Sequence, residues 1–497
     1  MPVGETVTGT SSRAAGLLAR WPDDTRADRL ARGLGRRITK GRRPARHGRL
    51  LLPPGLALAT AVAGGLLAAP ASASPAGSQP SALTLSWGSN SNGQLGIGAS
   101  CISGTGPNCL SLSPVQVRGT GTTPALQPVT RVAGGTAHSL ALTAGGQVRA
   151  WGDGEQGQLG NGTHVFEENR PVAVVGQNGT GQLGSITAIA AGNTSSLALA
   201  RTSIGAGGQV WAWGTNIWGQ LGDGTSAGPE HCPVNRRPPS PSDVCSTIPV
   251  GVAGPGGTGR LSGIIALAAG DNHMVALRSD GTVWSWGLND LGQLGIGNST
   301  GPGRCKPYSN FNAAACSTTP VEAAGPAGQG VLNHVVAIAA GEDYTIAVRS
   351  DGSVWAWGSN AFSTLGQTAS WTPQQCNSPF APVPIPCSTV PVQVAGPGGA
   401  GHLTGITAVA ANGSPLGLHI LALGAGGTVW AWGQNDQGQL GLGQNTGPQQ
   451  CTTEHVPCSL TPAQVTGQGG QGTLPNVRGI AAGQAHSLAV QQRLNVP

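Results

Sequence analysis

The ten cysteines of this 497-residue chain fall into five local pairs, and each pair follows a Trp-Gly dipeptide. An even number of cysteines in an exported chain indicates disulfides, and the equivalent placement of the pairs favours bridging within each one. The alternative is a set of free or metal-binding thiols, but 6 to 12 residues separate the two members of a pair. Zinc sites use closer spacing and add paired histidines. The sequence therefore predicts no metal site and five disulfides: Cys101 with Cys109, Cys232 with Cys245, Cys305 with Cys316, Cys376 with Cys387, and Cys451 with Cys458.

Three histidines occupy one position of a recurring Gly-x-x-His pattern: His138, His273 and His486. Other copies of the pattern carry Ser195 and Tyr344 at that position. Two interpretations are open, a ring of ligands or a polar side chain that hydrogen-bonds nearby backbone in each repeat. We expect the structural role, because a residue repeated by symmetry usually serves the repeat.

Carboxylates are sparse in the chain that follows the N-terminal region. In that part, Glu167-Glu168 and Glu342-Asp343 are the only carboxylates adjacent in sequence. No nucleophile and base stand at a spacing that indicates a catalytic set. The Gly-rich segments 253–259 and 395–401 lack the trailing Lys and Ser/Thr of a phosphate-binding loop. We expect no catalytic residue and no cofactor. A propeller hydrolase stays open as an alternative, since such enzymes assemble sites from different blades.

Six tryptophans of the repeat pattern precede a glycine, and each could serve as a sugar-binding platform or as a packing anchor of the repeat. We expect anchors at Trp87, Trp151, Trp213, Trp286, Trp357 and Trp432. Trp218 and Trp371 lie outside the repeat pattern. They are the candidate ligand-binding residues.

All of these residues are placed by a long repeat whose clearest copy is Val283–Gly297. The six Trp-Gly dipeptides that begin with Trp87, Trp151, Trp213, Trp286, Trp357 and Trp432 are 64, 62, 73, 71 and 75 residues apart, and five of the six are followed by Gly-Gln-Leu-Gly. The unit predicts strands at 264–269, 273–277 and 282–286 and an outer strand at Pro320-Val321. Asp280-Gly281 predicts the tight turn of a hairpin. Four short strands per unit are typical of an all-β propeller, in which neighbouring blades cover each other's faces.

The two ends of the repeat region predict how the ring closes. The chain enters at a late strand, 83–87, and leaves with early strands in 480–490 that have no Trp-Gly of their own. Together these halves would complete one blade and remove the free sheet edges. We therefore expect one closed propeller of six blades over 83–490, followed by a tail at 491–497. Seven blades are the alternative.

The N-terminal region predicts export. Residues 1–50 carry twelve basic and four acidic residues, and an uncharged apolar run leads to Ala71-Ser72-Ala73. This pattern predicts a basic leader and secretory signal at 1–73, cleaved after Ala73, with a linker at 74–82. The alternative is an uncleaved membrane anchor with the propeller outside. The formal net charge is +6, so the remainder is slightly acidic and lacks the basic footprint of a nucleic-acid binder.

The motifs Ala-Ala-Gly-x-x-His, Asp-Gly-x-Val-Trp-x-Trp-Gly and Gly-Gln-Leu-Gly-x-Gly resemble the regulator of chromosome condensation repeat. The resemblance covers roughly residues 83–490 and implies a β-propeller, usually of seven blades. The activity for which that family is named, nucleotide exchange on a nuclear GTPase with chromatin binding, is not expected of a secreted chain. The fold is also similar to that of a secreted bacterial propeller that inhibits β-lactamases by covering their active site. That similarity implies a binding role rather than a shared target.

These observations predict a secreted, disulfide-stabilised, non-catalytic propeller that binds another molecule through a loop-rich face. A protein is the first expected partner, and cell-wall or other polysaccharide is the second. Neither nucleic acid nor a nuclear GTPase is expected as a partner. The membrane is expected to be met only through the signal segment before cleavage.

Overall fold

The computed structural model describes residues 84–99, 101, 108–121, 125–126, 128–201, 208–232, 243–305, 313–411, 418–451, 455–483 and 485–491. Within these residues the fold is built from strands and four single 3-10 turns. None of the described helical turns is long and apolar enough to span a membrane. The leader, the linker and residues 492–497 lie outside the described residues.

A single blade shows the architecture of all of them. Strands β12 (Ile264–Ala269), β13 (His273–Arg278), β14 (Val283–Leu288) and β16 (Ala314–Glu322) form an antiparallel sheet in that order. Gly281, at the turn between β13 and β14, has a φ of +81°, which an L side chain rarely adopts. The four strands predicted for this unit are confirmed. A further short strand, β15 (Gly303–Cys305), pairs with the outer side of β16 and was not predicted.

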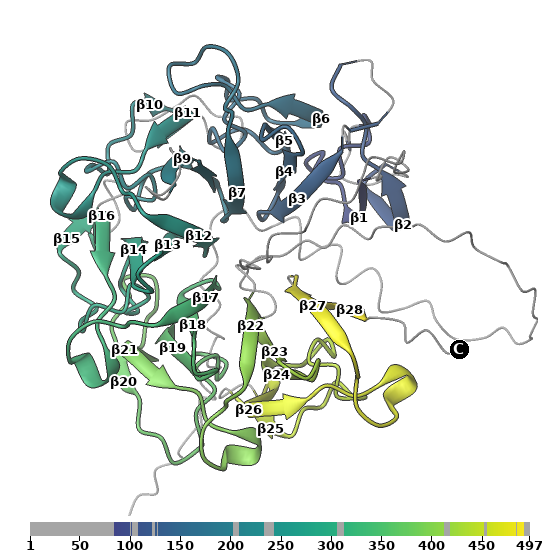
Figure 1. Ribbon diagram of the computed structural model, residues 1–497, viewed down its shortest axis with the longest axis vertical. Helices are drawn as coiled ribbons and strands as arrows, with labels where there is room; N and C mark the ends of the chain where they lie inside the picture. The colour runs from purple at the N-terminus through teal and green to yellow at the C-terminus, as the bar shows by residue number, and fades with distance from the viewer. Residues whose placement is uncertain are drawn as a thin grey trace, which may run out of the picture.

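Five such sheets stand around a common centre with their first strands innermost (Figure 1). The first blade comprises β3 (Val129–Gly134), β4 (His138–Thr143), β5 (Val148–Gly152) and β6 (Glu168–Ala173). The second comprises β7 (Ile186–Ala191), β8 (Ser195–Ala200), β9 (Gln209–Thr215), β10 (Glu230–His231) and β11 (Val244–Gly251). The third is the β12–β16 sheet. The fourth comprises β17 (Val335–Ala340), β18 (Tyr344–Arg349), β19 (Val354–Ser359), β20 (Gln374–Cys376) and β21 (Ile385–Gln393). The fifth comprises β22 (Ile406–Ala411), β23 (His419–Gly424), β24 (Val429–Gln434), β25 (Gln449–Gln450) and β26 (Pro457–Gln464).

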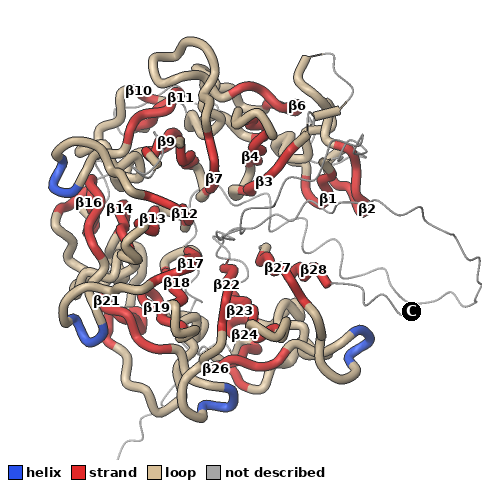
Figure 2. The backbone as a smooth tube through the Cα atoms, in the orientation of Figure 1, coloured by secondary structure: helices blue, strands red, loops and turns tan. Residues whose placement is uncertain are grey.

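Antiparallel pairing gives the ring two different faces. The turn after the first strand and the loop after the third strand of each blade lie on one face, together with the cysteines, and we call it the cystine face. The hairpin between the second and third strands and the connection to the next blade lie on the opposite face, the hairpin face. The 3-10 turns belong to connections of the hairpin face and lie at the periphery of the ring (Figure 2): η1 (Pro255–Gly257), η2 (Pro326–Gly328), η3 (Pro397–Gly399) and η4 (Gln468–Gly470).

The predicted closed ring of six blades is not formed in this structure. The ends of the repeat region are two separate two-stranded sheets, β1 (Leu85–Ser89) with β2 (Leu110–Gln116) and β27 (Val477–Ala482) with β28 (Ser487–Gln491). No described ladder joins β28 to β1, and Figure 1 shows the two sheets apart. The repeat count predicts which strands form but not whether the two ends of the repeat region pair. That pairing joins the most distant parts of the chain, and local motifs do not encode it.

The core lies between the blades. The largest cluster joins the fourth and fifth blades through apolar side chains such as Ile346, Val354, Ile420 and Trp432, all fully buried. Similar clusters join the first blade to the second and the second to the third. Each sheet therefore depends on its neighbours for burial, as the repeat pattern predicts.

Candidate functional site

The Gly-Gln-Leu-Gly motif is a contact between blades. Trp286 of the third blade donates its indole N–H to the backbone oxygen of Gln220 in the second, at 2.8 Å. The same bond of 2.8–3.0 Å recurs at the other blades: Trp151 to Gln94, Trp213 to Gln158, Trp357 to Gln293 and Trp432 to Thr364. These five tryptophans are at most 3% exposed, so the predicted anchor role is confirmed for them. Trp87 is 47% exposed.

The last glycine of the motif makes room for the tryptophan. A Cβ on Gly295 would lie 2.6 Å from Nε1 of Trp357, which is closer than real contacts allow. Gly295 also has a φ of +72°. Both facts select glycine at this position.

The repeated histidines also join neighbouring blades. Nε2 of His138 lies 2.9 Å from Oγ of Ser196, and Nε2 of His273 lies 2.9 Å from Oγ1 of Thr345. Each hydroxyl donates its own proton to a motif backbone oxygen, Ser196 to Gln158 and Thr345 to Gln293. The histidine must therefore be the donor, which fixes the neutral ring with its proton on Nε2.

Burial lowers the pKa of His138 to about 4 and that of His273 to about 3. Nδ1 of each ring is buried without a hydrogen-bond partner. The structural role predicted for His138 and His273 is confirmed, but each ring bonds a hydroxyl of the next blade rather than backbone. His419 makes the same bond to Ser487 at 2.9 Å. The sequence analysis missed His419 because residues 412–417 interrupt the pattern. Its spacing of 13 residues before Trp432 equals that from His273 to Trp286 and would have found it.

All five predicted disulfides are formed, and no described cysteine is free. The bridges join Cys101 to Cys109, Cys232 to Cys245, Cys305 to Cys316, Cys376 to Cys387, and Cys451 to Cys458. In four complete blades the bridge ties the short outer strand to the fourth strand, as where Gly303 pairs with Cys316 and Cys305 with Ala314. All five bridges lie toward the cystine face, in the loops or at the strand ends that border them.

The first and last bridges differ from the others in burial. Cys109, directly before β2, is half-buried, as is Cys451 at the end of β25. Cys458 lies within β26 and is fully buried. Both members of the other three bridges are at most 2% exposed. Reductants should therefore reach the Cys101–Cys109 and Cys451–Cys458 bridges first, because thiol–disulfide exchange needs access to a sulfur atom.

Reduction is expected to loosen these loops and leave the blades folded, because the tryptophan-to-carbonyl and histidine-to-hydroxyl bonds between blades involve no cysteine. Each bridge closes a loop worth roughly 2.5–3 kcal/mol in the chain-entropy model, so the melting temperature should fall. Circular dichroism under mild reductant should retain the β signal. Loss of the whole signal would show that the bridges hold the ring itself.

The loop between Cys376 and Cys387 reaches across to neighbouring blades. Its Phe380 packs edge-on against Trp218 of the second blade, with ring centroids 5.3 Å apart. Its Ser378 donates a 2.6 Å hydrogen bond to Oδ2 of Asp290 in the third blade. The loop thereby rests on two blades while Val383 stays 53% exposed.

A ligand-binding tryptophan needs an exposed ring face, and neither candidate, Trp218 or Trp371, is fully exposed. Trp218 is fully buried, in a cluster with Ile217, Leu288 and the Cys305–Cys316 bridge. Its ring therefore presents no face to a ligand. Trp371 is half-buried against the core shared by the fourth and fifth blades.

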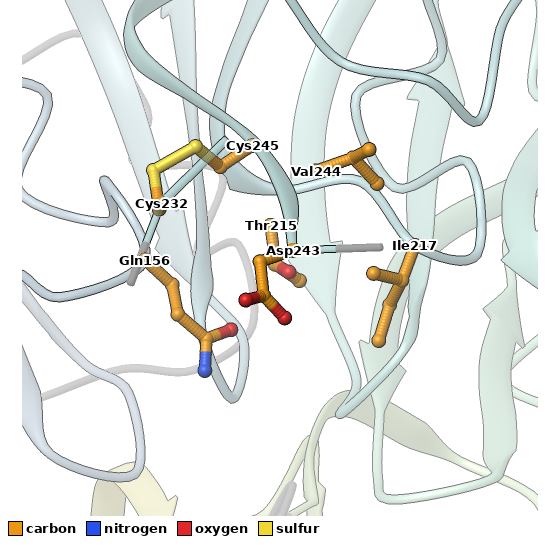
Figure 3. A pocket seen from close by; sticks show the side chains of 7 residues that line it. All are labelled: Gln156, Thr215, Ile217, Cys232, Asp243, Val244 and Cys245. Atoms are coloured by element: carbon orange, nitrogen blue, oxygen red, sulfur yellow. A yellow bond between two sulfur atoms is a disulfide. The ribbon is translucent and has the colours of Figure 1, made fainter. Parts of the chain in front are cut away.

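A small hollow of about 10 Å³ opens on the cystine face beside the Cys232–Cys245 bridge (Figure 3). Gln156 reaches it from the first blade, and Thr215, Ile217, Asp243 and Val244 complete its lining. Glu230, Cys232 and Cys245 also offer ligand atoms within 4.8 Å of one another. Because the two sulfurs are joined as a disulfide, this group offers a metal only one carboxylate.

Four carboxylates gather on the cystine face between the third and fourth blades, and we call them the acidic quartet: Asp271, Asp290, Glu342 and Asp343. Asp271 and Glu342 lie in the inner turns of neighbouring blades, where the Asp271 N–H donates to the Glu342 backbone oxygen at 3.3 Å. A Cβ on Gly270 would lie 2.3 Å from the backbone oxygen of Gly341, so glycine lets these turns approach.

Gln293 links two members of the quartet. Its Nε2 donates to Oδ1 of Asp290 at 3.2 Å and to Oδ1 of Asp343 at 3.1 Å. Asp271 is 5% exposed, and its Oδ1 is buried without a hydrogen-bond partner. Sequence analysis noted Glu342-Asp343 but not the group. A signal was present in the sequence: Asp271 and Glu342 each directly follow the blade glycine in two consecutive repeats.

Burial raises the pKa of every member of the quartet. The pKa of Glu342 rises to about 8 through burial and then the charge of Asp271. Burial and Asp343 raise the pKa of Asp271, and burial with Glu342 and Asp290 raises that of Asp343. Burial also raises the pKa of Asp290. Ionising these groups together is unfavourable without a compensating cation.

Charge divides between the two faces of the ring. Most described carboxylates lie on the cystine face: Asp153, Glu155, Glu167, Glu168, Asp223, Glu230, Asp243, Asp436 and the acidic quartet. Most described arginines lie toward the hairpin face: Arg118, Arg149, Arg201, Arg260, Arg278, Arg349 and Arg478. Arg170 and Arg304 are exceptions on the cystine face. Arg236, Arg237 and Lys306 lie outside the described residues.

These features define a disulfide-bonded β-propeller whose blades are tied by a tryptophan-to-carbonyl bond. The chain belongs to the regulator of chromosome condensation family. Matches to the "Regulator of chromosome condensation (RCC1) repeat" cover residues 83–142, 145–199, 207–277, 280–348 and 426–490. A second model of that repeat matches 129–158, 264–293 and 335–364. The predicted family is thus confirmed.

Similar proteins include the ultraviolet-B receptor UVR8 of Arabidopsis thaliana, which is 28% identical over 399 residues, 73% of this chain and 75% of that protein. The human E3 ubiquitin-protein ligase HERC2 is 28% identical over 81% of this chain, but the match spans 6% of HERC2. Among solved structures, human WBSCR16 has a TM-score of 0.55 and 21% identity, with 82% of each chain covered. Yeast RCC1 (Prp20) bound to Kap60 has a TM-score of 0.54 and 22% identity, covering 83% of this chain and 77% of that one. These structural similarities show the fold alone.

Proposed function

We propose that this chain is a secreted, non-catalytic protein that binds another protein through its cystine face. A relative with this repeat is a receptor, and a structural neighbour, yeast RCC1 (Prp20), was solved bound to another protein, Kap60. This supports a protein-binding or regulatory role at the level of the class. The choice of face and the extracellular setting come from this chain's own residues.

The observation that carries the proposal is the cross-blade loop 377–386. A disulfide closes it, Pro379, Pro382, Pro384 and Pro386 restrict its backbone, and Phe380 and Ser378 fix it to two other blades. Such a loop has already lost most of the freedom that binding would remove, so less of the interaction energy is spent on ordering. Its exposed Val383 gives a partner an apolar contact.

The two alternatives have less support. A polysaccharide platform needs exposed planar rings, whereas Trp218 and five of the repeat tryptophans are buried. A propeller hydrolase needs carboxylates that line a cavity open to substrate. The hollow beside Cys232–Cys245 is lined by one carboxylate, Asp243.

Export is proposed from the leader at 1–73 together with the five disulfides. Disulfides persist in oxidising compartments and are rare in the cytosol of mesophiles, so the five bridges are consistent with an extracellular protein. The proposed mature chain begins after Ala73 with the linker at 74–82.

We further propose that the working ring closes as a sixth blade, with β28 pairing to β1. In complete blades the residue after the repeated histidine pairs with the anchor tryptophan, as Ser139 does with Trp151. The same register would pair His486 with Gly88 and Ser487 with Trp87. Leu85 and Leu488, now 38% and 36% exposed, would then be covered.

The fifth blade supports this closure because its tryptophan contact is vacant. The Gln439 backbone oxygen accepts a 2.7 Å bond from Ser487, as Gln158 accepts one from Ser196. Trp213 also donates to Gln158, whereas no tryptophan among the described residues donates to Gln439. A Cβ on Gly441 would meet only Val465, whereas at Gly295 it would meet a tryptophan. Trp87 is the one repeat tryptophan that is exposed, and in the closed ring it would donate its indole N–H to Gln439.

The function is tested by two matched substitutions in a pull-down. The oxidised 74–497 fragment is immobilised and exposed in parallel to culture supernatant proteins and purified cell wall. Val383→Asp places a charge on the cystine face, and Val331→Asp places one at a 41% exposed valine on the hairpin face.

We expect one protein to be retained at physiological salt, Val383→Asp to reduce its retention at least fivefold, and Val331→Asp to leave it unchanged. Greater loss with Val331→Asp would reject the cystine face. Retention on cell wall alone would favour the polysaccharide alternative, and retention on neither would reject the binding proposal.

A further inference from the structure

The acidic quartet has a group that lacks a partner. Oδ1 of Asp271 is enclosed and makes no hydrogen bond, in a residue that is 5% exposed. Glu342 and Asp343, the members of the quartet in the neighbouring turn, are half-buried. A buried carboxyl oxygen without a hydrogen-bond partner is costly, so a bound donor would stabilise it.

The width of the quartet decides which donor fits. The described residues contain no set of three quartet ligand atoms that all lie within 4.8 Å of one another, so the group is not a closed cage for a bare cation. The Gln293 amide already spans the gap between Asp290 and Asp343. A flat group with several N–H donors can likewise bond carboxyl oxygens that stand apart, as this amide does. The arginine guanidinium has this form, with five donors in a rigid fork.

We infer that the acidic quartet receives an arginine side chain of the protein partner. This inference rests on the proposed function and specifies the partner's chemistry. The excess of carboxylates on the cystine face would attract a basic surface, and the quartet would accept the one arginine that enters it. The negative charge of the cystine face would steer the partner, and the buried hydrogen bonds between its arginine and the quartet would give specificity.

Arginine binding is coupled to the ionisation of the quartet. A guanidinium stays protonated and stabilises carboxylates in their charged form. Because burial holds the pKa of Glu342 at about 8, binding near neutral pH should release protons. Affinity should therefore rise as the pH rises from about 6 to about 8.5.

The test uses the oxidised full-length chain and the peptide acetyl-Arg₄-amide as probe, measured by calorimetry at fixed ionic strength. The site variant combines Asp271→Asn, Glu342→Gln and Asp343→Asn. The control variant removes the same charge elsewhere on the same face through Glu168→Gln, Asp223→Asn and Asp436→Asn. Asp271→Asn alone is a milder variant, and thermal melts establish that each protein is folded.

We expect the site variant to weaken peptide binding at least tenfold and Asp271→Asn to weaken it at least threefold. The control variant should change it less than twofold, and the pH dependence should vanish in the site variant. Equal weakening in site and control variants would show diffuse attraction only and overturn the inference. So would stoichiometric binding of Ca²⁺ without binding of the peptide, which would indicate a metal site. Either result leaves the pull-down outcome standing, whereas failure of the pull-down rejects the proposed function whatever the peptide does.

Discussion

Replacing Trp87 with alanine is expected to lower the free energy of unfolding by about 3–5 kcal/mol, the usual cost of removing a buried tryptophan. The reason is ring closure, in which Trp87 would fill the contact of Gln439 and Gly441 that is otherwise vacant. The measurement is denaturant unfolding of the oxidised protein, followed by circular dichroism.

Trp286→Ala is the matched control, since Trp286 is fully buried and donates to Gln220 in the structure. Both substitutions should cost similar amounts. A cost below about 1 kcal/mol at Trp87 alongside the full cost at Trp286 would mean that the ring stays open, because exposed side chains contribute little.

Replacing His273 with glutamine is expected to make the protein less sensitive to acid. The folded pKa of His273 is about 3, below its ordinary value of 6.5, because burial disfavours the charged ring. The unfolded chain therefore binds a proton before the folded one does. Stability from the neutral ring is fully present above pH 6.5 and is lost as the pH falls toward 3.

The glutamine amide can still donate to Oγ1 of Thr345 but does not titrate. The advantage of the wild type over His273→Gln should therefore shrink by roughly 3 kcal/mol between about pH 7 and pH 4, at about 1.36 kcal/mol per pH unit. The difference in unfolding free energy between the two proteins removes the pH dependence contributed by carboxylates that both share. A difference that does not change with pH would contradict the neutral, buried ring.

The repeat motifs alone determined most of what lies within a blade. Val283–Leu288 and its partners were predictable because alternation, the Asp280-Gly281 turn and the spacing of Trp286 are local features. The five disulfides were equally predictable, since both members of each pair lie in one loop. The structural role of His138 and His273 followed from their repetition.

The contacts between blades depended on the tertiary structure. Burial of Trp218 depends on residues of other blades, among them Leu288 and Phe380. Phe380 is 162 residues away along the chain and belongs to a loop two blades further on. The acidic quartet exists because glycines at 270 and 341 let two turns meet, and its raised pKa values follow from burial there. The separation of charge between the faces is invisible in the net charge of +6.

Local sequence therefore determined the blade, its anchors and its cystine loops, because these depend on turns and on residues near one another in the chain. Tertiary structure decided which side chains from different blades share a dry space and which of them remain without a partner. The reason is physical. Backbone conformation and loop closure are local, whereas desolvation and charge–charge interaction depend on neighbours in space.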